Sequence, residues 1–336
     1  DGSKHFDIYC WPFEMRSGLK GKLGEFPFPT FWGPMAGQHS PAGKPEAVSE
    51  WIANSAKWIE EQQQPTLNLV YLPHLDYNLQ RLGPKHPDIN DDLRRIDNIV
   101  GGLIEFFESR GVRVVLLSEY GITPVDQPIH LNRLFREQGW ITIKEELGLD
   151  RLDCGNSKAF AVADHQVAHV YINDSTIEAK ARSLLETTPG VAYVWGAAEK
   201  QANGIAHDRA GDLIATSAEN AWFTYYYWMD DQLAPDFARC VDIHRKPGYD
   251  PVELFKDPAR GAMPRVMLKL LRKKLGFRVL MDVIPLDATL VKGSHGCRPK
   301  DKADWPLLIS KQTDLATDTP LSSTDVYGLL RSYVLD

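Results

Sequence analysis

Two short apolar runs on either side of a long amphipathic segment constrain the fold of this chain more than any other feature. Residues 67–72 and 112–117 are mostly apolar and short, as buried strands are. Between them, residues 88–110 repeat apolar side chains at helical spacing, and Gly111 follows where such a helix would end. A strand, a helix and a strand in this order predict a right-handed crossover and a parallel sheet.

The other patterned segments predict helices around this core and an antiparallel region beside it. Helices are expected over residues 44–63, 131–138, 176–186, 265–274 and 323–333. Short β runs are expected over residues 159–172, 191–195, 212–217 and 222–228. The prediction is an α/β fold with a mainly parallel central sheet flanked by helices, and with a smaller antiparallel β-rich region.

Four stretches of different character follow one another along the 336 residues. We expect an extended aromatic and proline-rich segment packed on the core over residues 1–44, and a parallel α/β core over residues 45–146. A β-rich subregion or cap is expected over residues 147–240, and a return to the α/β core over residues 241–336.

Charge and composition exclude several classes of protein. The 45 acidic residues outnumber the 38 basic ones, and a net charge of −7 argues against a nucleic-acid polymer as partner. No run of 18 apolar residues is present, so no membrane span is expected. The four cysteines are far apart, which predicts reduced thiols rather than a disulfide framework. Because no signal peptide is visible, a cytoplasmic location is expected; the absent initiator Met predicts a processed product or fragment.

Two carboxylates stand just beyond the predicted parallel strands. Asp76 follows the first apolar run and Glu119 follows the second, and parallel strands bring their carboxyl ends to one edge. Two acids at one edge repel each other unless a cation lies between them, and a divalent metal ion is the simplest candidate. Taken alone, each acid is also explained as a helix cap or a hydrogen-bonded loop carboxylate.

Histidines add further candidate ligands. His295 lies within a Gly-Ser-His-Gly segment, where small neighbours let the backbone approach a site closely. Asp242 and His244 are expected on the same side of an extended stretch. His165 and His169 have even spacing in a β run, so we expect them to be core-edge residues rather than ligands.

Two segments allow either a purely structural or a functional interpretation. The aromatic residues between positions 222 and 228 are expected to form a strand with one buried face, or else to stack on a base or sugar. The basic amphipathic segment 265–274 is expected to face the core with its apolar side, or else to lie on a membrane surface.

The order of these motifs resembles the alkaline phosphatase superfamily, and within it the type I phosphodiesterase/nucleotide pyrophosphatase family. In that family, Pro-Asp-x-x-x-His, Ser-Asp-His-Gly and Gly-x-His-Gly segments supply ligands to two metal ions. Asp76 stands at the first Asp, Glu119 at the second Asp and His295 at the last His. Residues 207–213 and 324–326 resemble two further family motifs, and the likeness covers about residues 65–336.

The chain also departs from the family pattern. Gln80 and Tyr120 occupy the positions of two family histidines, and His244 with Asp242 are the candidates to replace them. The family carries one more metal-binding Asp and a Thr or Ser nucleophile nearer its N-terminus. We therefore expect the missing N-terminal segment of the same protein to be a partner of this site.

The resemblance implies hydrolysis of phosphate esters, diesters or pyrophosphates rather than monoesters, through a covalent phospho-enzyme. It implies two divalent metal ions, zinc by resemblance, with manganese, iron or magnesium as alternatives for an oxygen-rich site. A small phosphate-ester substrate is expected beside Lys246, Arg245, Tyr120, Gln80 and His74. A degenerate metal-binding or scaffold protein and a phosphoryl-group transferase remain open alternatives.

Overall fold

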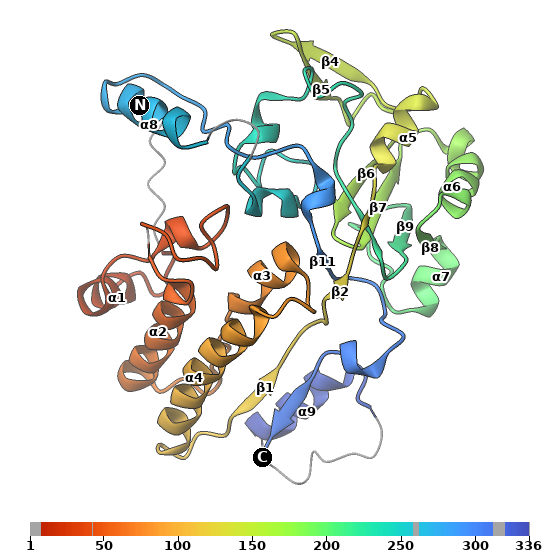
Figure 1. Ribbon diagram of the computed structural model, residues 1–336. Coiled ribbons are helices and arrows are strands. Elements are labelled where there is room, and N and C mark those ends of the chain that lie inside the picture. Colours follow the sequence, from red (N-terminus) through yellow and green to blue (C-terminus); the bar gives the residue numbers. More distant parts are fainter. Residues whose placement is uncertain (1–7, 42, 258–261, 312–319, 336) are drawn as a thin grey trace.

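The computed structural model describes residues 8–41, 43–257, 262–311 and 320–335, so parts of the predicted segment 1–44 lie outside the described residues. Figure 1 shows a helical region at one side of the molecule and a β-rich region at the other, with the last quarter of the chain returning past both. The chain is therefore a mixed α/β protein, as predicted.

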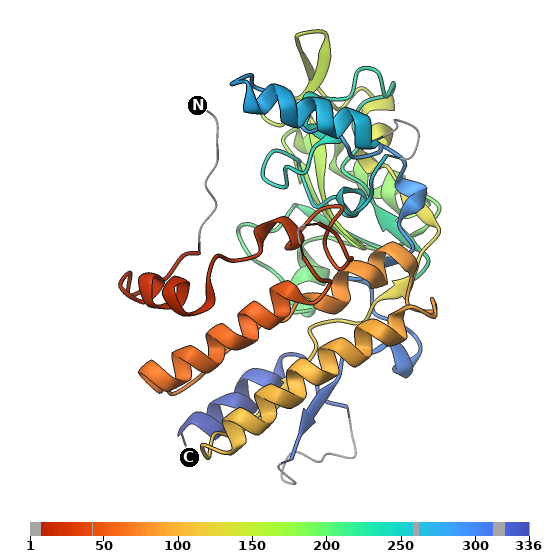
Figure 2. The ribbon, with the colours of Figure 1, turned by 60° about the vertical axis from the view of Figure 1, so that its left-hand side comes forward.

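The helical region is built from α1 (Met15–Leu23), η1 (Phe28–Thr30), α2 (Ala47–Gln63), α3 (His74–Leu82) and α4 (Ile89–Glu108). Helices α2 and α4 lie side by side in Figure 2 and pack through a small apolar cluster: Ala53, Ala56, Leu103 and Phe107. The predicted helices over 44–63 and 88–110 are confirmed as α2 and α4. Helix α1 falls within a segment predicted to be extended, and α3 was not predicted.

The first predicted strand, residues 67–72, forms no ladder and belongs to no strand. Its exposure nevertheless alternates as in a strand. Val70 and Leu72 pack against the α2–α4 cluster, whereas Leu69 and Tyr71 are exposed. The backbone is therefore extended, with helices against one side only.

The second predicted strand exists as β1 (Val115–Leu117), but its partner differs from the prediction. It pairs antiparallel with β12 (Leu308–Ser310), which returns from the C-terminal part of the chain. The predicted parallel pairing with residues 67–72 does not form. Among the described residues, the one parallel ladder joins β3 (Gln127–Ile129) to β10 (Ala221–Phe223).

The β-rich region is centred on a four-stranded antiparallel sheet of order β6-β7-β9-β8, as the sequence predicts for this part of the chain. Its strands are β6 (Ala159–Asp164), β7 (Val167–Ile172), β8 (Val191–Trp195) and β9 (Leu213–Ser217). Around it lie α5 (Leu131–Glu137), the hairpin of β4 (Ile143–Glu146) and β5 (Leu149–Leu152), η2 (Ser175–Ile177), α6 (Glu178–Thr187) and α7 (Ala197–Ala202).

The aromatic residues after β10 differ from both interpretations offered by the sequence. Strand pairing stops at Phe223, and every side chain from 222 to 228 is buried. Trp222 and the four aromatic residues 225–228 form a core cluster with apolar residues of later segments, among them Phe237, Val252 and Ile284, whereas Phe223 belongs to the core of the four-stranded sheet. Because neither face is open, this run offers no surface on which a base could stack.

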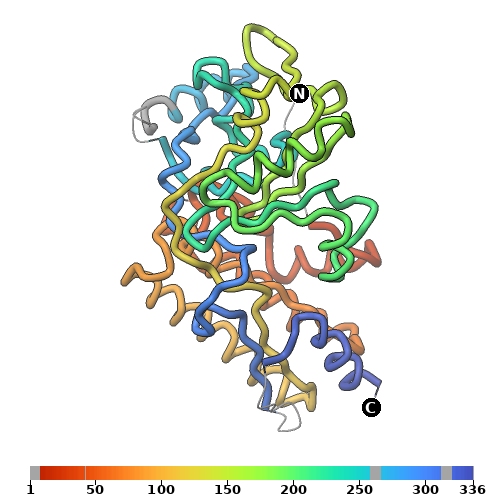
Figure 3. Tube along the Cα trace, turned by 90° about the vertical axis from the view of Figure 1, so that its right-hand side faces the viewer, coloured from red at the N-terminus to blue at the C-terminus, as the bar shows by residue number. Residues whose placement is uncertain are grey.

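The return segment contains η3 (Asp236–Arg239), η4 (Pro251–Leu254), α8 (Ala262–Lys274), η6 (Ala288–Leu290), β11 (Gly293–Ser294), η7 (Lys302–Asp304) and α9 (Asp325–Leu335). Strand β11 pairs antiparallel with β2 (Thr123–Pro124), and Figure 3 shows this return alongside the middle of the chain. Helices α8 and α9 confirm two predicted helices.

The expectation that the apolar side of α8 faces the core is wrong, because Leu268, Leu271 and other apolar residues of α8 are exposed. In the described part of the chain, no helix is both long and apolar enough to cross a membrane.

Candidate active site

Helix α3 positions Asp76 at the junction of the two regions. The helix begins directly after Pro73, and the carboxylate lies in its first turn, where the helix dipole favours a negative charge. The helix is fixed against α4, since Asn78 donates a hydrogen bond to Asp92 (2.7 Å) and His74 Nε2 lies 3.3 Å from Asp92 Oδ1. Asp76 is thus held on a buried and braced element.

The loop after β1 brings Tyr120 to Asp76. The Tyr120 hydroxyl donates to Asp76 Oδ1 over 3.3 Å. Gly121 follows, and a Cβ atom there would lie 1.7 Å from the Asp304 carbonyl oxygen, so only glycine fits this close approach. Glu119, next to Tyr120, is exposed. Its charge contributes to the raised pKa of Tyr120, after burial and Asp76.

His295 follows β11 and completes the contact. Its ring stacks on Tyr120, with the ring centroids 3.6 Å apart and the planes 8° apart. This placement depends on Gly293, because a Cβ there would lie 2.2 Å from the Leu79 carbonyl oxygen in α3. The glycine before His295 therefore allows the close backbone approach that the sequence predicts.

His165 packs on the other side of His295, with ring centroids 4.0 Å apart. It occupies the turn between β6 and β7 at a φ of +56°, a conformation in which a non-glycine residue is strained. The next residue, Gln166, is fully buried and donates its backbone N–H to the His295 carbonyl (2.9 Å). The Gln166 side-chain oxygen accepts from the Cys297 N–H (3.2 Å), so one residue holds both segments together.

Tyr249 and Trp32 extend the aromatic wall. The Tyr249 ring lies 4.8 Å from His165 and 4.9 Å from Trp32, measured between centroids. The Tyr249 N–H donates to the Ala163 carbonyl (2.8 Å), which docks this loop on the edge of β6. We call Asp76, Tyr120, His165, Tyr249 and His295 the seam cluster.

Burial governs the protonation of the seam cluster. It raises the pKa of Asp76, while polar contacts from Gln80 and Tyr120 oppose part of the rise and the Asp164 charge adds to it. Burial lowers the pKa of His295 to about 4, so its ring is neutral at pH 7. Burial lowers the pKa of His165 as well. The cluster therefore presents one carboxyl group, that of Asp76, and two neutral imidazoles, and neutral imidazoles are common metal ligands.

The donors among the described residues do not complete a metal centre. Among the described residues, no group of three or more His, Cys, Asp and Glu side chains is arranged to hold an ion. Asp76 is hydrogen-bonded to Tyr120, and His295 lies between two ring faces. The two-ion site implied by the resemblance is not formed by these side chains alone.

Asp242 and His244 differ from their prediction. They lie in a turn rather than an extended stretch, since the Arg245 N–H donates to the Asp242 carbonyl (3.2 Å). His244 is exposed, and Asp242 Oδ2 lies 3.6 Å from Arg245 Nη1. The pair does not replace the family histidines in this structure, because no contact in the described part of the chain joins either residue to the seam cluster.

Three predicted substrate-binding residues are engaged elsewhere. Lys246 is buried with its ammonium 2.8 Å from Asp250 and 2.7 Å from Glu253. Arg245 pairs with Asp236 (3.0 Å). His74 is buried beside Asp92, so none of the three faces a substrate at the seam cluster.

Sequence reasoning missed His165 and Tyr249. His165 was assigned to a continuous β run, but His165-Gln166 is a two-residue turn between two six-residue strands. The length of that β run was the available signal, because 14 residues exceed an ordinary strand. Tyr249 carried no signal, since only the folding of the loop onto Ala163 brings it to the seam cluster.

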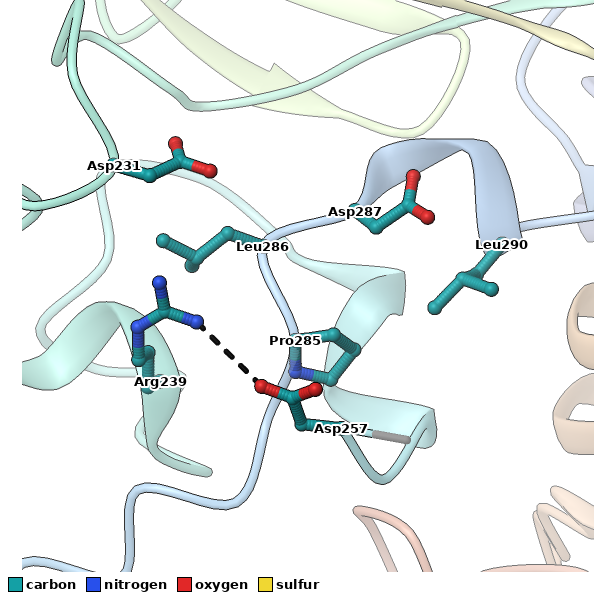
Figure 4. Close-up of a pocket in the computed structure, with 7 residues that line it drawn as sticks. All are labelled: Asp231, Arg239, Asp257, Pro285, Leu286, Asp287 and Leu290. Atoms are coloured by element: carbon teal, nitrogen blue, oxygen red, sulfur yellow. Dashed lines mark ion pairs between the residues drawn. The ribbon is translucent and has the colours of Figure 1, made fainter. Parts of the chain in front are cut away.

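A separate cavity of about 400 Å³ lies outside the seam cluster. Figure 4 shows its lining side chains, in which Arg239 and Asp257 form an ion pair of 3.8 Å. None of its lining residues belongs to the seam cluster.

Comparison with known proteins identifies the family. The family model described as type I phosphodiesterase/nucleotide pyrophosphatase matches residues 3–250. The chain belongs to this family. The match begins earlier than the likeness noted in the sequence and ends at residue 250, so it includes the segment upstream of residue 65 and leaves out most of the return segment, His295 included.

Individual relatives are more distant. An uncharacterized pyrophosphatase/phosphodiesterase of Schizosaccharomyces pombe is 29% identical over 98 residues, which are 27% of this chain and 19% of that protein. Phosphonoacetate hydrolase from Sinorhizobium meliloti in complex with phosphonoformate aligns with a TM-score of 0.40 at 17% identity, over 58% of this chain and 47% of that one. Murine ectonucleotide pyrophosphatase/phosphodiesterase 5 aligns with a TM-score of 0.38 at 16% identity, over 56% and 46%. The chain thus spans under a fifth of the yeast relative and about half of these solved structures.

Proposed function

We propose that this chain forms one part of an enzyme that hydrolyses phosphate esters, with small phosphodiesters or pyrophosphates as substrates. One observation carries the proposal: Tyr120 contacts both Asp76, at 3.3 Å, and the His295 ring, at 3.6 Å. Three motifs that are distant in sequence therefore share one place. Membership of the phosphodiesterase/pyrophosphatase family supports this class of reaction.

The charge of the seam cluster explains why cations belong to the proposal. Asp164 acts on Asp76 electrostatically and Glu119 acts on Tyr120, so negative charges surround the site. A phosphodiester is itself an anion and would be repelled. We include two divalent metal ions, zinc by resemblance, which would neutralise the phosphate oxygens. Asp76 and His295 would contribute to one ion and Glu119 to the other, with the remaining donors outside the described residues.

We place the Thr or Ser nucleophile, which would form the covalent phospho-enzyme, in a segment of the same protein that precedes this chain. Residues 67–72 support this placement, because their inner side chains pack on α2 and α4 while Leu67, Leu69 and Tyr71 face solvent. An extended segment with helices on one side only is where a further strand would add to the fold. The chain also spans only part of its relatives.

Three of the cysteines, Cys154, Cys240 and Cys297, are free thiols. Reducing compartments keep thiols in this state, which supports a cytoplasmic location as part of the proposal.

The experiment is a hydrolysis assay on the full-length protein with bis-p-nitrophenyl phosphate and added zinc or manganese. We expect His295→Ala and Glu119→Ala each to lower kcat/KM at least about 10–100-fold, because loss even of a side chain that only orients a metal ligand costs this much. Matched controls at exposed positions are His39→Ala and Glu145→Ala, which should retain full turnover. Wild-type turnover in both site variants would overturn the proposal.

A degenerate scaffold of the same fold is the second candidate, and the lack of a three-donor group among the described side chains favours it. Full-length protein that binds no metal and hydrolyses no diester would establish the scaffold. Metal bound in stoichiometric amounts together with turnover would exclude it.

A further inference from the structure

Helix α8 is joined by its polar edge to the segment that follows it in the chain. The Lys269 ammonium bonds the Asp282 carboxylate and the Leu280 carbonyl, and its side chain is only 16% exposed. Since residues three to four apart share a helix face, the opposite face of α8 points away from Leu280 and Asp282. Figures 1 and 2 show α8 along the outside of the molecule.

The outward face of α8 is apolar. Met267 is 64% exposed, Leu268 57% and Leu271 54%, and the face continues beyond the helix through Leu275 and Phe277, at 67% and 58%. An amphipathic helix of a globular protein ordinarily turns such residues inward. A contiguous exposed apolar face of this kind marks an interaction surface.

The flanks of this face are strongly basic. Residues 262–281 contain six Lys and Arg residues and no Asp or Glu, although the whole chain has a net charge of −7. Positive charge is thus concentrated beside the exposed leucines. Lys274 lies within the apolar arc, and its long aliphatic stem allows its ammonium to reach the polar side of an interface.

We propose that α8 and the residues up to Phe277 form a docking surface for an anionic lipid bilayer, on which the helix lies in the plane of the headgroups. Leucine and phenylalanine side chains would enter the acyl boundary, and the basic flanks would contact anionic headgroups. A second copy of the chain is disfavoured as the occupant because two such basic faces repel. A protein groove would have to enclose the helix, whereas Leu280 and Asp282 of this chain already cover its Lys269 edge.

The test measures sedimentation of the chain with vesicles of phosphatidylcholine alone or with added phosphatidylserine. We expect binding to the anionic vesicles, with weakening by salt. Leu271→Asp should lower the partition coefficient at least about tenfold, because a buried leucine is lost from the interface. The pair Lys273→Gln and Lys274→Gln should lower it about fivefold for each charge removed.

The matched control is Leu147→Asp, a fully exposed leucine at the β4–β5 turn, which should bind vesicles as the wild type does. Thermal unfolding of each variant shows that the fold is kept. The proposal is overturned if anionic and neutral vesicles bind equally, or if Leu271→Asp binds as well as wild type. A lipid-free dimer that Leu271→Asp dissociates, without vesicle binding, would assign the face to a second copy instead.

Discussion

The β-rich region and the helical region bury their apolar residues to very different extents. In the β-rich region the large aromatic residues from 222 to 228 are at most 1% exposed. In the helical region Leu67, Leu69 and Tyr71 are 50%, 81% and 56% exposed, although they follow one another in an apolar run. The core of the first region is closed by its own residues together with those of the return segment, whereas the second region covers only one side of its extended segment.

This difference bears on the site, because the seam cluster lies where the two regions meet. His165 and Tyr249 are fixed to β6, inside the closed region. Asp76 and Tyr120 come from the helical region and from the loop after β1. Two members of the cluster are therefore held by the closed region, and two others adjoin the surface on which we place further residues of the protein.

Among these substitutions, the largest loss in the free energy of unfolding is expected from Lys246→Met, at a lysine buried in the closed, β-rich region. Burial by itself would lower the pKa of Lys246. The charges of Asp250 and Glu253 have a larger effect, so the pKa of Lys246 is raised. Removing the cation leaves two buried carboxylates without it, which costs about 3–5 kcal/mol of the free energy of unfolding. Denaturant titration measures this loss.

Lys44→Met is the matched control, since its ammonium lies 3.3 Å from Glu50 in a pair whose side chains are 61% and 41% exposed. An exposed pair contributes under about 1 kcal/mol. Equal losses in the two variants would contradict a closed core around Lys246.

Acid should weaken the closed region through His130. Burial, followed by the Arg133 charge, lowers the pKa of His130 to about 4 from a usual value of 6.5. Between these values the unfolded chain binds more protons than the folded one, so stability is complete above pH 6.5 and is lost as the pH falls towards 4. The loss reaches about 3 kcal/mol.

His130→Gln should reduce the slope of stability against pH in this window. Unfolding at pH 8, where His130 is neutral in both states, measures separately the cost of losing its 2.7 Å hydrogen bond with Thr224. An unchanged slope between pH 4 and 6.5 would refute the role of His130.

Local patterns predicted the elements that depend on local spacing. The periodicity of residues 88–110 predicts α4, and the β runs predict the strands β6 to β9. The pairing of strands was predicted less well, because the partner of a strand depends on which distant segments fold beside it. Residues 67–72 have the composition and the exposure pattern of a strand, yet β1 pairs with β12 from the far end of the chain.

The same limit applies to the site. The order of the motifs predicted that the segments of Asp76, Glu119 and His295 belong together, and the structure brings Asp76 and His295 to Tyr120. The charge of Lys246 predicts a contact with an anionic substrate, but the sequence does not reveal that the carboxylates of Asp250 and Glu253 pair with its ammonium. A cationic side chain near a motif indicates a substrate contact only when it does not form an ion pair with a buried carboxylate.

The smallest change in the free energy of unfolding is expected at Leu69. This substitution tests directly whether the exposed side of residues 67–72 is covered in the longer protein. Leu69→Ala should change the free energy of unfolding by less than about 0.5 kcal/mol, because the side chain is exposed. Leu213→Ala, the matched change at a buried leucine of β9, should cost about 2–5 kcal/mol. In the longer protein the cost at Leu69 should rise towards that at Leu213, since the proposed upstream segment would cover it. A cost at Leu69 that is the same in both lengths would show that nothing packs on this side of residues 67–72.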